Sequence, residues 1–265
     1  MLQEGLDLLA EARDLDAILD QLSDEDWSRT TTFMEWTPWD VVAHLHYFDL
    51  VSLAALEGDE TFVRERDALM KRVMDGATNK EIARERFSGI KAKDLRARWL
   101  ESCNEMSTQL GESDPKRRLP WFGPDMGVRM FTTARYMEAW AHGQEIYDLL
   151  GVERKYNDRI KNICAIGIKT FGWTFVNRKL DIPGPAPYLR LIAPSGEIWE
   201  WNDASDEERI TGAASDFCHV VTQGRNVAET KLEVVGDVAT QWMSIAQCFA
   251  GSPVDPPKSG QRNRR

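Results

Sequence analysis

The chain has 265 residues, a length that fits one large domain or two modest ones. Its 33 basic and 43 acidic side chains give a net charge of −10, which disfavours binding to nucleic acid or to an anionic membrane surface. A hydrophobic share of 42% and a charged share of 29% are typical of a globular protein with a sizeable core. Any histidine-based site must use some of the four histidines, which are His44, His46, His142 and His219.

The beginning of the chain is acidic and amphipathic, and it lacks the basic and continuous apolar regions of a signal peptide. No apolar stretch reaches the ~18 residues that a membrane span needs. The 4 cysteines form no CxxC motif, and their wide spacing indicates no disulfide framework. We therefore expect a cytoplasmic protein with reduced thiols and with neither a membrane nor a nucleic acid as its partner.

The first third of the chain is predicted to be helical. Apolar residues recur at helical spacing over residues 3–22, which indicates a first helix. Thr37 is followed by a proline and then, three residues after Thr37, by Asp40, a combination typical of a capped helix start. The second helix should run from there to Gly58, and the charged segment 60–74 predicts a third.

The helical pattern continues through the middle of the chain. Residues 79–110 predict one long helix, and the proline-containing segment 111–125 predicts a loop. A strongly periodic segment, 128–150, predicts a helix that ends at Gly151. Residues 157–180 predict one more helix.

The composition changes at the proline-rich segment 182–187, which predicts a linker. Residues 188–192 and 197–202 are expected to form a hairpin around the turn residues 193–196. Three further elements are predicted: a helix over 211–223, a strand over 231–235 and a closing helix over 237–250. The sum is an α+β protein with a helical domain over 1–183, a small α/β domain over 184–252 and a disordered tail over 253–265.

Three residues predict a metal site. His44 lies on the apolar stripe of the second predicted helix, so its side chain should point inward. Glu138 and His142 are four residues apart and stack on one face of a later helix. Burying a carboxylate and an imidazole on a largely apolar face is costly without a partner, and a divalent metal supplies one. Two histidines and one glutamate match three-ligand catalytic zinc sites with an open fourth position. A hydrogen-bonded core histidine and a surface Glu–His pair are the alternatives that the spacing leaves open.

Two other histidines are interpreted as bystanders. His46 is rotated by about 200° from His44 around the helix axis, so it faces another side. His219 follows Asp216 and Cys218 closely, but neighbouring helix positions point in different directions, so the spacing alone supports no nucleophilic site. Arg135 precedes Glu138 by three residues and could pair with it across the helix, so it is interpreted as a structural residue.

Two segments carry a resemblance to a known family. W-T-P-W-D-V-V-A-H-L at 36–45 and R-Y-M-E-A-W-A-H-G-Q-E-I at 135–146 resemble the metal-binding domain of mycothiol-dependent maleylpyruvate isomerase. That domain belongs to the wider DinB-like group, so the resemblance implies an N-terminal up-down four-helix bundle. It also implies that His44, Glu138 and His142 bind a metal, with zinc as the expected ion.

The C-terminal region resembles the same family more loosely. I-T-G-A-A-S-D-F-C-H-V-V-T-Q-G-R and G-D-V-A-T-Q-W are similar to its small C-terminal α/β domain, which also resembles sterol-carrier-like folds. The arginine that the family uses for substrate carboxylates falls on Arg225, and a guanidinium suits bidentate carboxylate recognition. A solvated arginine in a surface turn is the alternative. The segment around Cys218 and His219 departs from the expected pattern, which leaves the substrate open.

The resemblance implies a metal-dependent enzyme of the maleylpyruvate isomerase type. Zinc, or another divalent metal, would activate mycothiol, another low-molecular-weight thiol or water for addition to a small electrophilic substrate that carries a carboxylate. Isomerase, transferase and metal-water hydrolase activities would use the same apparatus and stay open. A non-catalytic, metal-containing protein that binds a small molecule or a lipid is the alternative from another class. Both a monomer and a homodimer agree with the sequence.

Overall fold

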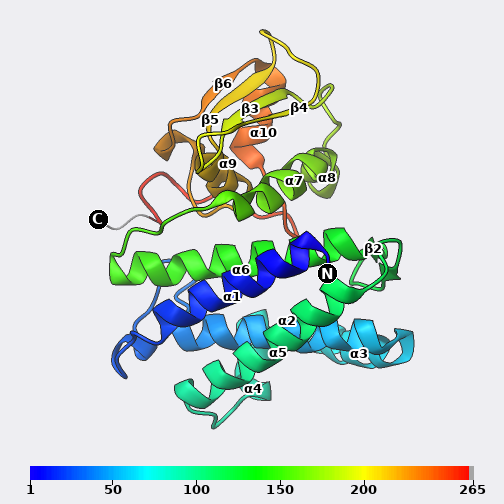
Figure 1. The fold of residues 1–265 in the computed structure, drawn as a ribbon, viewed down its shortest axis with the longest axis vertical. Helices are drawn as coiled ribbons and strands as arrows, with labels where there is room; N and C mark the ends of the chain where they lie inside the picture. The colour runs from blue at the N-terminus through cyan, green and yellow to red at the C-terminus, as the bar shows by residue number, and fades with distance from the viewer. Residues whose placement is uncertain (263–265) are drawn as a thin grey trace. The chain divides into compact units, whose positions relative to one another are not determined.

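The computed structural model describes residues 1–262, and the chain divides into two compact units, Met1–Val152 and Glu153–Arg265. The first unit is built mainly from helices, whereas the second combines helices with a four-stranded sheet (Figure 1). The predicted α+β fold is therefore confirmed. Within residues 1–262, no helix has both the length and the hydropathy that crossing a membrane requires.

Four long helices form a bundle in the first unit: α1 (Gln3–Leu19), α2 (Pro38–Glu57), α5 (Ala92–Glu112) and α6 (Val128–Leu150). Both α1 and α2 pack against α5 and α6. Large aromatic side chains, Trp99, Phe131, Tyr136 and Trp140, are fully buried in this unit. Their burial supplies much of the apolar area that stabilises the bundle.

Contacts at the helix ends show how the four helices run. Arg96, near the start of α5, binds Asp16, near the end of α1, so these two helices are antiparallel. The indole of Trp39, near the start of α2, donates to a carbonyl two residues before α5, so α2 and α5 start together. Arg129 near the start of α6 binds Glu4 near the start of α1. The order is up, down, down, up, which refines the predicted up-down bundle.

The start of α2 is fixed by its own sequence. The Thr37 hydroxyl accepts the N–H of Asp40, and the Asp40 carboxylate accepts the N–H of Thr37, which is the predicted capping box. Arg84, from α4 (Asn79–Arg86), also binds the Asp40 carboxylate. These bonds define where α2 begins and therefore where His44 lies.

The connections of the first unit differ from the prediction in one place. The single helix predicted over 79–110 is wrong, because α4 and α5 are separate helices with a break at Gly89, whose φ of +79° is left-handed. Helix α3 (Asp59–Met74) and the end of α6 at the left-handed Gly151 agree with the prediction. Two short strands, β1 (Arg118–Leu119) and β2 (Met126–Gly127), pair within and next to the predicted loop.

The second unit contains a sheet in the order β4-β3-β5-β6 (Figure 1). Strands β3 (Tyr188–Ile192) and β4 (Ile198–Trp201) form the predicted antiparallel hairpin. Strand β5 (Arg209–Ala213) pairs parallel with β3, and β6 (Glu233–Val235) pairs antiparallel with β5. The prediction of helix from residue 211 was therefore wrong at its start, because pairing with a distant strand decides the structure there.

Within the described part of the second unit, the α-helices are α7 (Lys161–Lys169), α8 (Phe171–Asn177), α9 (Ala214–Val221) and α10 (Asp237–Ile245). The continuous helix predicted over 157–180 is divided at Thr170, which is not helical. The closing helix is shorter than the predicted 237–250. The core here includes Trp242, whose ring meets the rings of Phe171 and Phe217.

Helices α7 and α8 pack with elements of the second unit, α7 against α9 and α8 against α10. Gly167 permits this close approach, because a Cβ there would lie 3.0 Å from side-chain atoms of α9. The division after Val152 therefore differs from the boundary predicted at 183. Part of the tail predicted to be disordered has hydrogen-bonded partners, since Arg178 binds Asp255 and Asn226 binds the carbonyl of Pro257. Residues 263–265 lie outside the described residues.

Candidate metal centre

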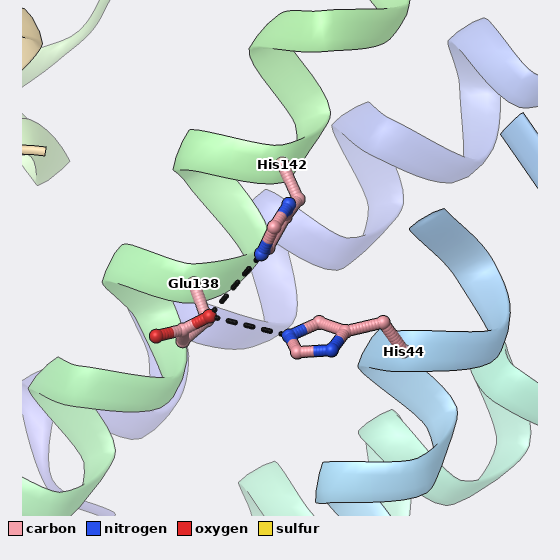
Figure 2. Close-up of side chains that lie close together, drawn as sticks. All are labelled: His44, Glu138 and His142. Carbon is pink, nitrogen blue, oxygen red and sulfur yellow. Dashed lines mark ion pairs between the residues drawn. The ribbon is translucent and has the colours of Figure 1, made fainter. Parts of the chain in front are cut away.

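The three predicted ligands lie together in the first unit. His44 lies in the second turn of α2, and Glu138 and His142 lie on successive turns of α6. Figure 2 shows the two imidazoles and one Glu138 oxygen pointing toward one another from these two helices. The structure thus brings together the histidine from one helix and the i, i+4 pair from another, as the sequence predicts.

The distances within this cluster suit a metal better than a direct ion pair. Glu138 Oε2 lies 3.5 Å from His44 Nε2 and 3.4 Å from His142 Nε2. A charge-assisted N–H···O bond is shorter, at about 2.7–2.9 Å. Two donor atoms held about 2.05 Å from one tetrahedral zinc ion lie about 3.4 Å apart. The two N···O distances therefore match two edges of such a tetrahedron.

Burial and charge favour the same interpretation. Burial lowers the pKa of His44 to about 4, against the opposing effect of Glu138, so this imidazole is neutral at pH 7. Burial opposes the ionisation of Glu138, but interactions with His142 and His44 outweigh it and lower the pKa of the carboxyl well below its usual range. An ionised carboxylate facing a neutral imidazole is the protonation state that a metal needs in its ligands.

His44 has an unusual hydrogen-bonding environment. Its side chain is 8% exposed, and neither ring nitrogen has a hydrogen-bond partner among the described residues. A buried polar group without a partner costs about 1–3 kcal/mol. A cation bound at Nε2 would satisfy one of the two nitrogens, so the residues present fit a metal ion. The side chain of Glu138 is more open, at 24% exposed.

Aromatic rings surround the two imidazoles. The ring of Trp36 is parallel to that of His142, with centroids 5.3 Å apart and an interplanar angle of 3°, and it also meets His44 at 5.1 Å. Phe33 contacts His142 at 5.2 Å, and Phe48 contacts His44 at 4.9 Å. Trp36 belongs to the family motif at 36–45, whereas no sequence pattern singled out Phe48. The available signals were that Phe48 lies one helical turn after His44 and that Trp36 lies just before the helix that carries His44.

A buried ion pair joins the same two helices. The Nη2 atom of Arg135 on α6 lies 2.8 Å from Oδ1 of Asp49 on α2, and both side chains are at most 5% exposed. The predicted pairing of Arg135 with Glu138 was therefore wrong. Arg135 binds Asp49 because it lies on the side of α6 that faces α2, and a buried carboxylate such as Asp49 is stabilised by a neighbouring cation.

The remaining predicted residues lie elsewhere. His46 Nδ1 is 2.8 Å from the Ser102 hydroxyl, and its ring stacks on Phe87, so it does not join the cluster. His219 belongs to the second unit, where its Nε2 lies 2.7 Å from the Tyr156 hydroxyl. Arg225 also belongs to the second unit; its guanidinium donates to the carbonyl of the preceding residue, and its role as a substrate ligand stays a prediction.

The fold and the cluster define a class of protein: a four-helix bundle with a candidate metal centre of two histidines and one glutamate, joined to a small α/β unit. Residues 8–147 match the family model of the mycothiol maleylpyruvate isomerase N-terminal domain, and this match includes all three candidate ligands. The chain belongs to this family. The predicted resemblance is therefore confirmed.

Relatives and solved structures agree with this assignment. Two uncharacterized proteins from two strains of Mycobacterium tuberculosis are each 34% identical over 251 residues, which cover 93% of this chain and 95% of the relative. The fold is similar to crystal structures of the mycothiol-dependent maleylpyruvate isomerase and of a mutant of it. Each has a TM-score of 0.55 and 13% identity, with 87% of this chain and 92% of that chain covered. At this identity the likeness shows the fold alone.

Proposed function

We propose that His44, Glu138 and His142 hold one divalent metal, with zinc as the first candidate, and that the protein is a metal-dependent enzyme of the maleylpyruvate isomerase type. The observation that supports this best is the pair of N···O distances of 3.4 and 3.5 Å around a buried, neutral histidine. Membership of the family supports mycothiol, or another low-molecular-weight thiol, as the second reactant.

The residues of the cluster would have distinct roles. A bound zinc ion would lower the pKa of a thiol or a water molecule in its open position. The two histidines supply neutral nitrogen donors, and Glu138 supplies the one negative charge of the set. Because Glu138 is the most exposed of the three side chains, its side of the cluster is where a thiol would enter. The surrounding aromatic rings keep water away from the two imidazoles.

The proposed reaction begins with a thiolate. Its sulfur adds to one carbon of an activated double bond, the resulting single bond rotates, and loss of the thiolate restores the double bond in the other geometry. Arg225, in the second unit, is proposed separately as a residue that binds a carboxylate, since an anion needs a local cation in a chain with a net charge of −10. Transfer of the thiol to an electrophile, and hydrolysis by metal-bound water, are variants of this proposal that use the same residues.

The number of candidate ligands favours an enzyme over a binding protein. Among residues 1–262, the side chains grouped closely enough that they could hold a metal ion are His44, Glu138 and His142. A structural zinc site normally has four protein ligands, whereas three ligands leave a position open for a reactant. We therefore place catalysis ahead of a purely structural metal in a small-molecule or lipid carrier. A cytoplasmic location, as a monomer or a homodimer, completes the proposal.

Metal analysis tests the site directly. Protein purified without added metal should contain about one equivalent of zinc, and His44→Ala and His142→Ala should lose it because each removes one of three ligands. The matched control is His46→Asn, which changes a buried histidine of the same helix outside the cluster and should keep the metal. Circular dichroism checks that the variants fold. Full metal content in both alanine variants would refute the site.

Calorimetry tests the use of the metal. Mycothiol should bind the zinc-loaded protein, and the affinity should fall strongly when a chelator removes the metal. Equal binding to the two forms would exclude thiol activation while leaving the metal site intact. In that case the carrier function would be favoured.

A further inference from the structure

The most unusual feature of the cluster is that no hydrogen bond to a described residue orients the ring of His44. Histidines that bind metals nearly always donate their second ring N–H to a carboxylate, a carbonyl or water, which fixes the orientation of the ring. The Nδ1 atom of His44 has no such partner among the described residues. Its ring lies instead between Trp36, at 5.1 Å and 58°, and Phe48, at 4.9 Å and 55°. Aromatic packing must therefore set the orientation of this imidazole.

Trp36 occupies the central place in that packing. Among the residues that the structure describes, it alone has a ring against both imidazoles, tilted on His44 and parallel to His142. Phe33 contacts His142, and its ring also meets Trp36 edge-on at 5.0 Å. The indole is buried, at 6% exposed, so it has little freedom to move away. One side chain can thus hold the ligand of α2 and a ligand of α6 in a fixed relation.

The backbone before α2 is built to hold this indole. Met34 and Glu35 have φ values of +47° and +54°, which is a costly conformation for residues other than glycine. The turn is closed by the N–H of Trp36 donating to the Phe33 carbonyl at 2.9 Å, and Lys80 donates to the Glu35 carbonyl at 2.8 Å. Two adjacent strained residues persist only where the surrounding structure enforces them, and such strain clusters at functional sites.

The ring face also matches the charge of a loaded site. An imidazole that binds a divalent cation carries part of the positive charge, and the face of an indole is negative. The parallel arrangement of Trp36 on His142 would therefore favour the metal-bound form over the empty one. Trp36 immediately precedes Thr37, the cap residue of α2, so it is covalently joined to the segment that positions His44.

We propose that Trp36, held by the strained turn 33–36, is the positioning residue of the metal centre: its ring packing orients His44 in place of a hydrogen bond and holds His142 beside it. This inference rests on the proposed metal site. It assigns to the residues before α2 a part in metal affinity and coordination geometry, without contact with the metal itself.

Metal affinity in a set of tryptophan variants tests the inference. Zinc affinity, measured by competition with a chromogenic chelator, should fall about 10- to 100-fold in Trp36→Leu, the range known for residues that orient metal ligands. Trp36→Phe keeps a ring face and should lose less. The matched control is Trp39→Leu, three residues further on, whose indole donates to the Ile90 carbonyl and which should keep the zinc affinity.

Cobalt substitution supplies a second measurement. The visible absorption bands of Co²⁺ report coordination geometry, so they should shift in Trp36→Leu and stay unchanged in Trp39→Leu. If Trp36→Leu does not fold, Trp36→Phe decides: weaker zinc binding supports the inference, and unchanged affinity with unchanged bands overturns it. Equal losses in the Trp36 and Trp39 variants also overturn it, as an effect of general stability. Failure of the wild-type protein to bind zinc would overturn the proposed function itself, which is a distinguishable result.

Discussion

The buried pair of Arg135 and Asp49 offers a sharp test of how α2 and α6 are held together. The perturbation is Arg135→Met, which keeps much of the apolar stem and removes the charge. Asp49 is then left buried without its cation, and burial already raises the pKa of this carboxyl while Arg135 opposes the rise. Removing one partner of a buried pair typically costs about 3–5 kcal/mol.

The magnitude can be bounded from protonation. In the folded variant, Asp49 can take up a proton instead of remaining charged. Protonating a carboxyl whose ordinary pKa is 3.8 costs about 1.36 kcal/mol for each unit by which the pH exceeds 3.8. The destabilisation that the unpaired charge of Asp49 causes is therefore at most about 4 kcal/mol at pH 7 and about 1.6 kcal/mol at pH 5. The stability of the variant falls as pH rises, because the folded variant binds a proton at Asp49 that the unfolded chain has released.

Urea unfolding followed by circular dichroism provides the assay. Arg135→Met should be destabilised by about 3–4 kcal/mol at pH 7 and by less than about 2 kcal/mol at pH 5. Asp49→Leu should show no such relief in acid, because a guanidinium stays charged. The double variant should lie within about 1–2 kcal/mol of the wild type, since no unpaired charge remains. A loss below about 1 kcal/mol in Arg135→Met at pH 7, or an equal loss at both pH values, would refute this reasoning.

Two further predictions concern the bundle. Burial opposes ionisation of Asp40, but hydrogen bonds from Arg84 and Thr37 outweigh it and hold the pKa of Asp40 below 3.8. The ionised carboxylate therefore stabilises the fold above pH 3.8, and this stabilisation is lost as the pH falls through the lowered pKa. The advantage of the wild type over Asp40→Asn in urea unfolding should therefore shrink in acid, and a constant advantage would contradict this. Gly5→Ala would place a Cβ 2.7 Å from the Cα of Gly111. It should cost about 1–3 kcal/mol in thermal unfolding, while Gly127→Ala, with open space, should be nearly neutral.

Local chemistry made parts of the fold and site predictable. The start of α2 follows from Thr37 and Asp40, whose reciprocal bonds form within four residues. The pairing of Glu138 with His142 needs only the helical repeat. The addition of His44 needed the inward-facing stripe and the family resemblance as well. The capping box and the Glu138–His142 spacing were predictable because each lies within one helix or at its start, and the binding of a metal by the three residues stays a prediction.

Predictions failed where distant contacts compete with local propensity. Residues 211–213, the end of strand β5, were predicted as helix because their pairing with β3 is not visible in their own sequence. The break at Gly89 was missed because a lone glycine is tolerated in helical patterns. The contact between Cys164 and Cys218, whose sulfur atoms lie 3.6 Å apart, was not predicted because 54 positions separate the two residues in the sequence.

The sequence by itself determined the capped start of α2 and the end of α6 at Gly151, and together with the family resemblance it singled out the three candidate ligands. Only the tertiary structure showed that Arg135 binds Asp49 and that Trp36 packs on two imidazoles. The physical reason is that helical periodicity fixes which way a side chain points, whereas the neighbour it meets depends on how another helix runs and where that helix starts.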